Sequence, residues 1–258
     1  MPQALALSPH LDDAVFSCGG TLARLVNEGW QVTICTAFTR SVPSPSGFAL
    51  ACQLDKGLPP DADYMGLRKA EDAAACERLG ASPLWLDLPE APHRGYANAQ
   101  ALFAPPRNDD AVALPLSDML RDLLKVRPAL LLAPQALGGH VDHVLLIRAL
   151  RVVLPSDLPV WWWADFPYAI RPHTHPVSPF EQEMNILPEV AVRGDAEARF
   201  TACAAYVTQV GFQFGGAAAL AGMLEAAGPV ERLRAQGAHN IFSSSARRST
   251  HEPLWPAD

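Results

Sequence analysis

The sequence lacks the features that define several large classes of protein. It contains no Lys/Arg-rich run, and the formal net charge of the 258 residues is −7. A nucleic-acid partner would require a basic surface that neutralises phosphates. No apolar run approaches the roughly 20 residues that cross a bilayer, and no charged segment precedes the first apolar residues as in a signal peptide. We therefore expect no nucleic-acid partner and no membrane span.

Paired cysteines and a glycine-rich first turn are also missing. The five cysteines are odd in number and form no CxxC motif, which favours free thiols in a reducing, cytoplasmic setting over a disulfide scaffold. The first turn carries two acids in place of G-x-G-x-x-G, and their charge would repel the pyrophosphate of a dinucleotide. Gly19 and Gly20 follow later, where we expect them to allow close helix–sheet packing.

What the sequence does contain is an alternation of short apolar runs with helical patterns. The runs typical of strands are 4–7, 31–38, 84–88, 129–133 and 160–163. This order predicts parallel strands joined by right-handed crossovers, with helices on both faces. Uninterrupted apolar runs indicate burial on both sides. We predict an α/β fold with a doubly wound, mostly parallel, Rossmann-like sheet.

We expect a single domain over residues 1–258, with a core to about residue 210 and a C-terminal extension over 211–258. Residues 195–210 have the pattern of one long final helix. Two long irregular segments, 39–63 and 89–110, interrupt the alternation. Loops of this length in a compact domain are usually functional lids or disordered segments, so we place them around the rim of a site. Whether the chain forms a homo-oligomer is left open by the sequence.

Two short polar motifs follow predicted strands. SPHLDD (8–13) comes directly after the first strand, and GGHVDH (138–143) comes after the fourth. Ligands of open α/β sheets bind at the carboxyl ends of the strands. We therefore expect the two motifs to converge on one crevice, although they are far apart in the chain.

Together the motifs supply the donors of a metal site. The candidate residues are His10, Asp12, Asp13, His140, Asp142 and His143. Imidazole and carboxylate donors favour a divalent ion, with zinc as the main candidate, and three protein ligands would leave a position for water. A lone acid at this place would most simply be a helix N-cap. Two histidine-containing pairs at two strand ends favour the metal site.

SPHLDDA and GGHVDH resemble the signatures of the LmbE-like (PIG-L) family of zinc-dependent N-deacetylases, a PHPDDE-type first turn and a later HxDH. RKAEDAAACERLG (68–80) and AEARFTACAAYVTQ (196–209) are similar to two further family segments. The resemblance extends to about residue 210. Leu11 and Ala14 depart from the family's usual Pro and Glu, which weakens any inference about the substrate.

The resemblance implies a role for each residue of the two motifs. The zinc ligands would be His10, Asp13 and His143. Asp12 would be the general base that takes a proton from water. His140 would be the cationic group that stabilises the oxyanion, with Asp142 orienting it. One Zn²⁺ per chain is implied, and Fe²⁺ is an alternative.

The resemblance also implies a small-molecule substrate, an N-acetylated amino sugar that loses its acetyl group. An amidase for bulkier amides or thiol conjugates is one alternative, and a non-catalytic α/β binding module is another. Arg68 is either a substrate clamp or an arginine paired with Glu71 or Asp72. Arg94, in the second long loop, is a further candidate for substrate binding.

Two other features are weaker candidates for function. The rings of residues 161–163 alternate along a strand, so we expect them mainly in the core, with a sugar-binding wall as the alternative. The pair formed by His173 and His175 lies in a proline-rich loop, and we do not expect it to bind a metal.

Overall fold

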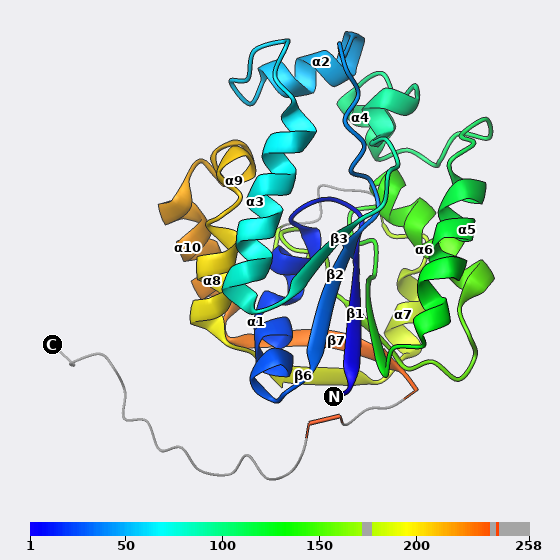
Figure 1. Cartoon of the computed structure of the whole chain (residues 1–258), viewed down its shortest axis with the longest axis vertical. Helices are drawn as coiled ribbons and strands as arrows, with labels where there is room; N and C mark the ends of the chain where they lie inside the picture. Colours follow the sequence, from blue (N-terminus) through cyan, green and yellow to red (C-terminus); the bar gives the residue numbers. More distant parts are fainter. Residues whose placement is uncertain (172–176, 238–240, 243–258) are drawn as a thin grey trace, which may run out of the picture.

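The computed structural model describes residues 1–171, 177–237 and 241–242. This part of the chain contains a seven-stranded sheet in the order β3-β2-β1-β4-β5-β7-β6 (Figure 1). The strands are β1 (Gln3–Ser8), β2 (Gln31–Thr36), β3 (Ser82–Trp85), β4 (Leu130–Pro134), β5 (Val160–Trp163), β6 (Glu189–Arg193) and β7 (Val230–Gln236). The first five strands pair in parallel, and β7 is antiparallel to both of its neighbours.

Helices cover both faces of the sheet. The α-helices are α1 (Asp13–Asn27), α2 (Gly47–Leu54), α3 (Tyr64–Leu79), α4 (Ala99–Leu102), α5 (Ala113–Leu123), α6 (Val141–Val153), α7 (Glu181–Ile186), α8 (Ala196–Cys203), α9 (Val207–Phe214) and α10 (Ala217–Ala227), and the short 3₁₀ turns are η1 (Ala91–Arg94) and η2 (Leu124–Val126). Helices α1, α3 and α8 pack on one face, and α5 and α6 pack on the other (Figure 1). The predicted doubly wound, mostly parallel sheet is confirmed.

Alternating side chains along each strand feed two separate cores. In β1, Ala4 and Ala6 join the core under α1, whereas Leu5 and Leu7 join the core under α6. The continuous apolar runs in the sequence have this cause, because both faces of the strand are buried. The three tryptophans of β5 are divided in the same way and are all at most 1% exposed. They are core residues, and the alternative of a sugar-binding wall is wrong.

The sheet continues past the predicted core limit near residue 210. Strand β7 lies between β5 and β6 and pairs with both, with Trp162 opposite Arg234 and Ala191 opposite Arg232. Residues up to Gln236 therefore belong to the core instead of an extension. The alternating charges of VERLRAQ (230–236) concealed this strand, because only every second side chain is buried.

The predicted long helix over 195–210 is wrong in one respect. Helix α8 ends at Cys203, and α9 begins at Val207. The break between them carries Tyr206, which is fully buried and donates its hydroxyl proton to Asp72 of α3 at 2.7 Å. Trp85 of β3 donates to the other carboxylate oxygen of Asp72, also at 2.7 Å. One straight helix over these residues would not place the Tyr206 hydroxyl against Asp72.

The two long predicted loops contain short helices that lie beyond the carboxyl end of the strands. Segment 39–63 includes α2, and segment 89–110 includes η1 and α4 (Figure 1). Within the described residues, no helix is both long and apolar enough to cross a membrane. The five cysteines, all of them described, are free thiols.

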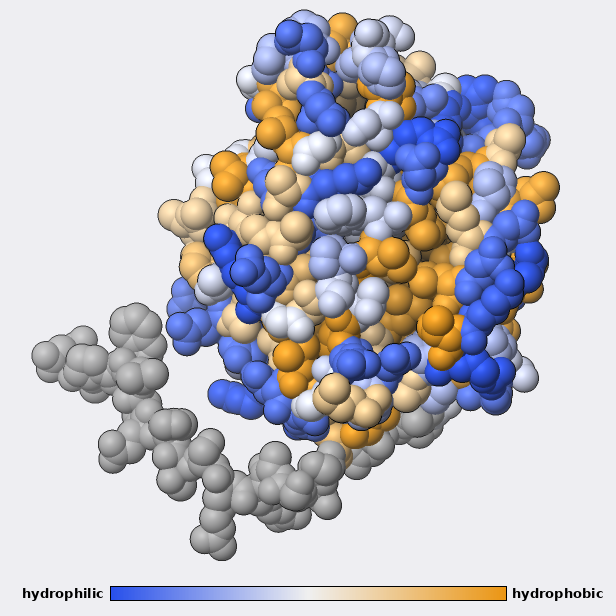
Figure 2. Space-filling model, in the orientation of Figure 1, coloured by the Kyte–Doolittle hydropathy of each residue, from blue (hydrophilic) through white to orange (hydrophobic). Residues whose placement is uncertain are grey.

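The face that carries the edge strand β3 exposes hydrophobic residues between β3 and α5 (Figure 2). Leu84, Leu114 and Val126 are among the large apolar side chains that remain accessible to solvent. Strand β3 forms its described strand pairing with β2 alone, so its outer edge has free hydrogen-bonding groups. An edge of this kind can pair with a second chain, and the formation of a homo-oligomer stays open.

The anchor at the helix break should be measurable as stability. We expect Tyr206→Phe to lower the free energy of unfolding by about 1–3 kcal/mol, because a buried acceptor on Asp72 loses its partner. Denaturant titration of both proteins measures the difference. In the background Asp72→Asn the same change should cost less, and equal costs in both backgrounds would contradict the bond.

Candidate metal centre

The two motifs meet at the carboxyl end of the sheet, as the sequence predicts. Strand β1 pairs in parallel with β4, with Ala6 opposite Leu132, so the turns that follow these strands are neighbours. His10 lies in the first turn, His140 directly precedes α6 and His143 lies in its first turn. One ring nitrogen from each histidine lies within 4.8 Å of the others. Imidazoles gathered in this way can hold a divalent metal ion.

Asp13 adds a carboxylate between two of these imidazoles. Its Oδ2 atom lies 3.1 Å from Nδ1 of His10 and 3.2 Å from Nε2 of His143. Tetrahedral bonds of about 2.0–2.1 Å would hold neighbouring donor atoms about 3.3 Å apart. The donors of His10, Asp13 and His143 therefore fit a divalent ion. Their role as ligands, which the family resemblance of the two motifs implies, stays a prediction.

A carboxylate holds the far nitrogen of each of these two imidazoles. Nε2 of His10 lies 3.0 Å from Asp142, and Nδ1 of His143 lies 2.7 Å from Asp165. This is the usual arrangement behind metal-binding histidines, because it orients the ring and raises its basicity. Burial lowers the pKa of both imidazoles, but their carboxylate partners outweigh it and raise the pKa of His143 to about 9.

Asp165 was not among the candidates from the sequence. It follows β5 just as the first motif follows β1, so its position at a strand end was the available signal. Its other carboxylate oxygen accepts a hydrogen bond from the backbone N–H of Leu137 at 2.9 Å. Asp165 therefore links the end of β5 to the turn that carries the second motif.

Asp142 serves a different histidine from the one expected. Its carboxylate contacts His10 and accepts from the backbone N–H of Ala91 at 3.1 Å, whereas the prediction had it orienting His140. The backbone of α6 explains the difference, because it is the N–H of Asp142 that donates to His140 Nδ1 at 3.2 Å. Its fully buried carboxylate is then free to reach across to the first motif.

Arg94 lies behind the cluster. Its guanidinium donates to Asp142 at 2.7 Å, to Asp110 at 3.0 Å and to the carbonyl of Pro89 at 2.7 Å. The predicted contact between Arg94 and a substrate has no support in this geometry, since the side chain is buried and committed to protein partners. Its position supports a structural role, in which it neutralises the carboxylate that orients His10.

His140 lies at the N-terminus of α6, with Nδ1 accepting the N–H of Asp142. This bond fixes the neutral tautomer that carries its proton on Nε2. Burial, with His10 nearby, lowers the pKa of His140 to about 3. The protein groups around His140 therefore favour a neutral imidazole that donates one hydrogen bond, whereas the sequence led us to expect a cation.

Asp12 is not needed as a helix cap. The backbone N–H of Ala14 donates to Ser8 Oγ at 3.0 Å, so the serine of SPHLDD takes the capping role. Asp12 has a φ of 156°, an unusual value for a residue with a side chain, and it is only 3% exposed. The turn thus directs the side chains of Asp12 and Asp13 to different partners.

The carboxylate of Asp12 is held by two side chains from distant helices. Gln213 of α9 donates to Oδ2 at 3.0 Å, and Arg68 of α3 lies 3.5 Å from Oδ1. Burial raises the pKa of Asp12 to about 7, although the charge of Arg68 opposes the shift. No pattern in the sequence indicated Gln213, which lies in an apolar stretch beyond residue 210.

Arg68 is ion-paired, but its partners differ from those proposed from helix spacing. It contacts Glu90 at 2.5 Å and donates to the carbonyl of Leu11 at 3.2 Å. The expected partners are used elsewhere, because Glu71 accepts from Thr208 and Asp72 accepts from Tyr206. Glu90 precedes η1, so this pair connects α3 with the second long segment beside Asp12.

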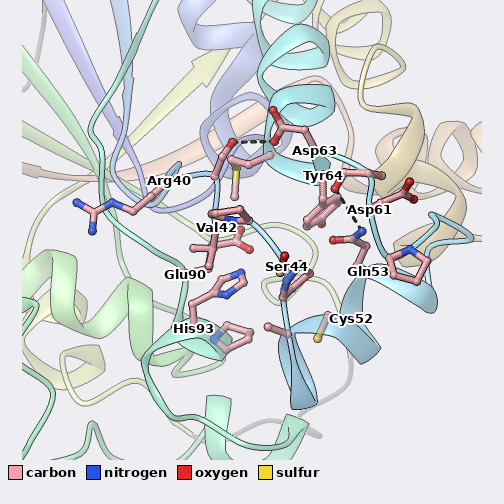
Figure 3. Close-up of a pocket in the computed structure, with 18 residues that line it drawn as sticks. Arg40, Val42, Ser44, Cys52, Gln53, Asp61, Asp63, Tyr64, Glu90 and His93 are labelled. Carbon is pink, nitrogen blue, oxygen red and sulfur yellow. Dashed lines mark hydrogen bonds between the residues drawn. The ribbon is translucent and has the colours of Figure 1, made fainter.

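A pocket of about 680 Å³ lies next to this pair, between the α2 segment and η1. Glu90 and His93 line it from the η1 side, and Cys52 and Gln53 line it from α2 (Figure 3). His93 is half-buried there. The pair His173 and His175 lies outside the described residues.

The chain is similar to several known proteins in sequence and in fold. A family model described as PIG-L, GlcNAc-PI de-N-acetylase, matches residues 5–154. The 2'-N-acetylparomamine deacetylase of Streptomyces fradiae is 34% identical over 173 residues, which are 65% of this chain and 58% of that protein. Its counterpart of the same name in Niallia circulans is 30% identical over 183 residues, covering 63% of this chain and 66% of that protein.

The chain therefore spans less than two thirds of the length of either relative. Among solved structures, the zinc-inhibited form of teicoplanin deacetylase is similar with a TM-score of 0.76 and 24% sequence identity. The similarity covers 90% of this chain and 97% of that chain. The two proteins share their fold.

A substitution at Asp165 tests the metal centre without replacing any proposed ligand. We expect Asp165→Asn to weaken the binding of a divalent metal by about 10–100-fold, because His143 loses the carboxylate that orients it. Competition with a chromophoric chelator measures the affinity. Asp157→Asn is the matched control, since Asp157 is exposed and pairs with Arg127 at the surface. Equal affinities in the two variants would contradict the assignment.

Proposed function

Because the chain belongs to the PIG-L family of GlcNAc-PI de-N-acetylases, we propose that it is a metal-dependent hydrolase that removes the acetyl group from an N-acetylated amino sugar. One observation carries the proposal. Three donors suited to a metal ion lie beside a buried carboxylate, Asp12, that is free of that donor set. The relatives named as 2'-N-acetylparomamine deacetylases support the substrate class.

The metal is proposed to be zinc, held by His10, Asp13 and His143. A zinc ion at this position supplies Lewis acidity toward a carbonyl oxygen and toward water. Two imidazoles and one carboxylate are a usual set for a catalytic zinc site. The carboxylates of Asp142 and Asp165 hold the two rings in place from behind.

Asp12 is proposed to be the general base. Its carboxylate accepts a proton from the attacking water, and the hydrogen bond from Gln213 and the charge of Arg68 hold it in one orientation. General bases positioned in this way contribute about 10²–10⁴-fold to the rate. The proton on Asp12 is then available to the nitrogen of the departing amine.

His140 is proposed to donate a hydrogen bond to the oxygen that becomes negative when water attacks the amide. The backbone N–H of Asp142 keeps the proton on Nε2. A donor fixed before the reaction stabilises developing charge without reorganisation. This role follows the prediction that His140 stabilises the oxyanion, with a neutral donor in place of a cation.

The sugar is proposed to bind on the side of Arg68 and Glu90. This pair lies between Asp12 and the pocket formed by the α2 segment and η1, and Glu90 lines that pocket. Glu90, which lines the pocket, can accept from neighbouring hydroxyls, while the buried Arg68 holds its carboxylate in place. The pocket has room for the part of the substrate beyond the acetylated ring.

The proposed reaction is tested by following the released acid. We expect the purified protein to release acetate from N-acetylated amino sugars, to lose this activity on treatment with a chelator and to regain it with zinc. Free amine and acetate are measured on the same samples, together with metal content. Release of a larger acid in place of acetate would favour the alternative amidase. A protein that binds no metal would overturn both enzyme functions.

Two substitutions separate the proposed base from the proposed ligands. We expect Asp12→Ala to keep about one zinc per chain and to lose turnover by about 10²–10⁴-fold, whereas His143→Ala should lose both zinc and turnover. Metal analysis and acetate release measure the two properties. Near-normal turnover in Asp12→Ala would show that this carboxylate is not the base.

A further inference from the structure

Helix α1 is broken close to the proposed metal centre. Cys18 has non-helical backbone angles (φ −139°, ψ 23°), so the helix consists of a short first segment and a longer second one. The first segment begins with Asp13 and ends near Ser17. Breaks of this sharpness have a local cause, commonly a side chain inserted into the ladder of backbone hydrogen bonds.

Two buried side chains from the C-terminal part of the chain replace the missing backbone bond. In an unbroken helix the N–H of Gly20 would donate to the carbonyl of Phe16. Here Glu231 of β7 accepts the N–H of Gly20 at 2.9 Å, and Arg199 of α8 donates from Nε to the carbonyl of Phe16 at 3.0 Å. Arg199 Nε also lies 3.4 Å from Glu231.

The charges of this pair match the two new helix ends. The guanidinium of Arg199 lies at the C-terminus of the first segment, and the carboxylate of Glu231 lies at the N-terminus of the second. Each charge is placed where the helix dipole stabilises it. Glu231 also accepts the backbone N–H of Thr21 at 2.6 Å and the Thr21 hydroxyl. Both charged residues are only 6% exposed.

The site of the break is closely packed, which explains the glycine at position 20. A Cβ atom there would lie 2.9 Å from a Glu231 oxygen and 3.2 Å from the backbone of Asp195. The N–H of Asp195 donates to the carbonyl of Gly20 at 3.0 Å. The expected close packing of Gly20 is therefore present, and its partner is the corner before α8.

The short first segment is tied to both halves of the metal centre. The N–H of Phe16 donates to the carbonyl of Asp12 at 2.8 Å, so the residue held by Arg199 also closes the turn of the first motif. Ser17 Oγ accepts the N–H of Phe166 at 3.0 Å. Phe166 directly follows Asp165, the carboxylate that orients His143.

We propose that Arg199 and Glu231 are positioning residues for the metal centre, which hold α1 open so that its first segment presents Asp12 and Asp13 at the required angle. The inference rests on the proposed function, because it assumes that Asp13 is a metal ligand. It assigns a role in metal binding to residues of α8 and β7 that touch neither metal nor substrate.

The test measures the metal centre directly. In Glu231→Gln the side-chain NH₂ group would face a backbone N–H donor, and Arg199 would lose its ionic partner while keeping its hydrogen bond to the carbonyl of Phe16. We expect zinc affinity, measured with a competing chelator, to fall on the order of tenfold, as for the loss of an outer-shell partner. The visible spectrum of the Co²⁺-substituted protein should change as well. Glu189→Gln is the matched control, because Glu189 forms an exposed pair with Arg232 on the neighbouring strands, and it should leave both readouts unchanged.

Thr21→Val is the milder variant and decides the matter if Glu231→Gln does not fold. It removes one hydrogen bond to Glu231 and keeps the backbone N–H, so we expect a smaller loss of zinc affinity in the same direction. If folded variants bind zinc as tightly as the wild type and give the same Co²⁺ spectrum, this inference is overturned even where thermal stability falls. If the wild type itself binds no zinc, the proposed function fails instead.

Discussion

The constraint on which the rest of the structure depends is the gathering of four carboxylates, three of them buried, at one end of the sheet. Asp12, Asp13, Asp142 and Asp165 lie within the same cluster, and each would be strongly destabilising without a partner. The structure supplies a cation or an N–H group to every one of them. These partners are Arg68 of α3, Arg94 of η1, Leu137 before α6 and His143 in its first turn, so the site can form only when these separate elements have packed together.

This distribution separates two layers of the site. The proposed ligands and base stand on the turns after β1 and β4, inside the region that the family model matches. A second set of residues lies beyond residue 154 and contacts the first set or the helix that carries it. Asp165 contacts His143, Gln213 contacts Asp12, and Arg199 and Glu231 bind the broken part of α1. The inner layer determines which chemistry is available, and the outer layer determines the geometry in which it operates.

The strands and the two motifs were readable because their signals are local. A run such as ALLLA (129–133) is buried on both faces, so its composition alone indicates the strand. The break at Tyr206 between α8 and α9 was missed because the helical periodicity of the sequence continues through it. Strand β7 was missed because its exposed side chains alternate with buried ones and carry charges. Arg68 was expected to pair with Glu71 or Asp72 but contacts Glu90, since helix spacing says nothing about groups that arrive from another loop. Asp142 was expected to orient His140 but contacts His10, which comes from the other motif.

The sequence by itself determined the fold class, the convergence of SPHLDD with GGHVDH and the set of donors available to a metal. All three follow from composition and from short-range periodicity. Only the tertiary structure decided which carboxylate meets which imidazole, that the backbone N–H of Asp142 donates to Nδ1 of His140, and that α1 is broken. Those outcomes depend on contacts such as Asp12 with Gln213, which are 201 residues apart. Such contacts are set by the packing of the sheet and helices, and no local pattern encodes them.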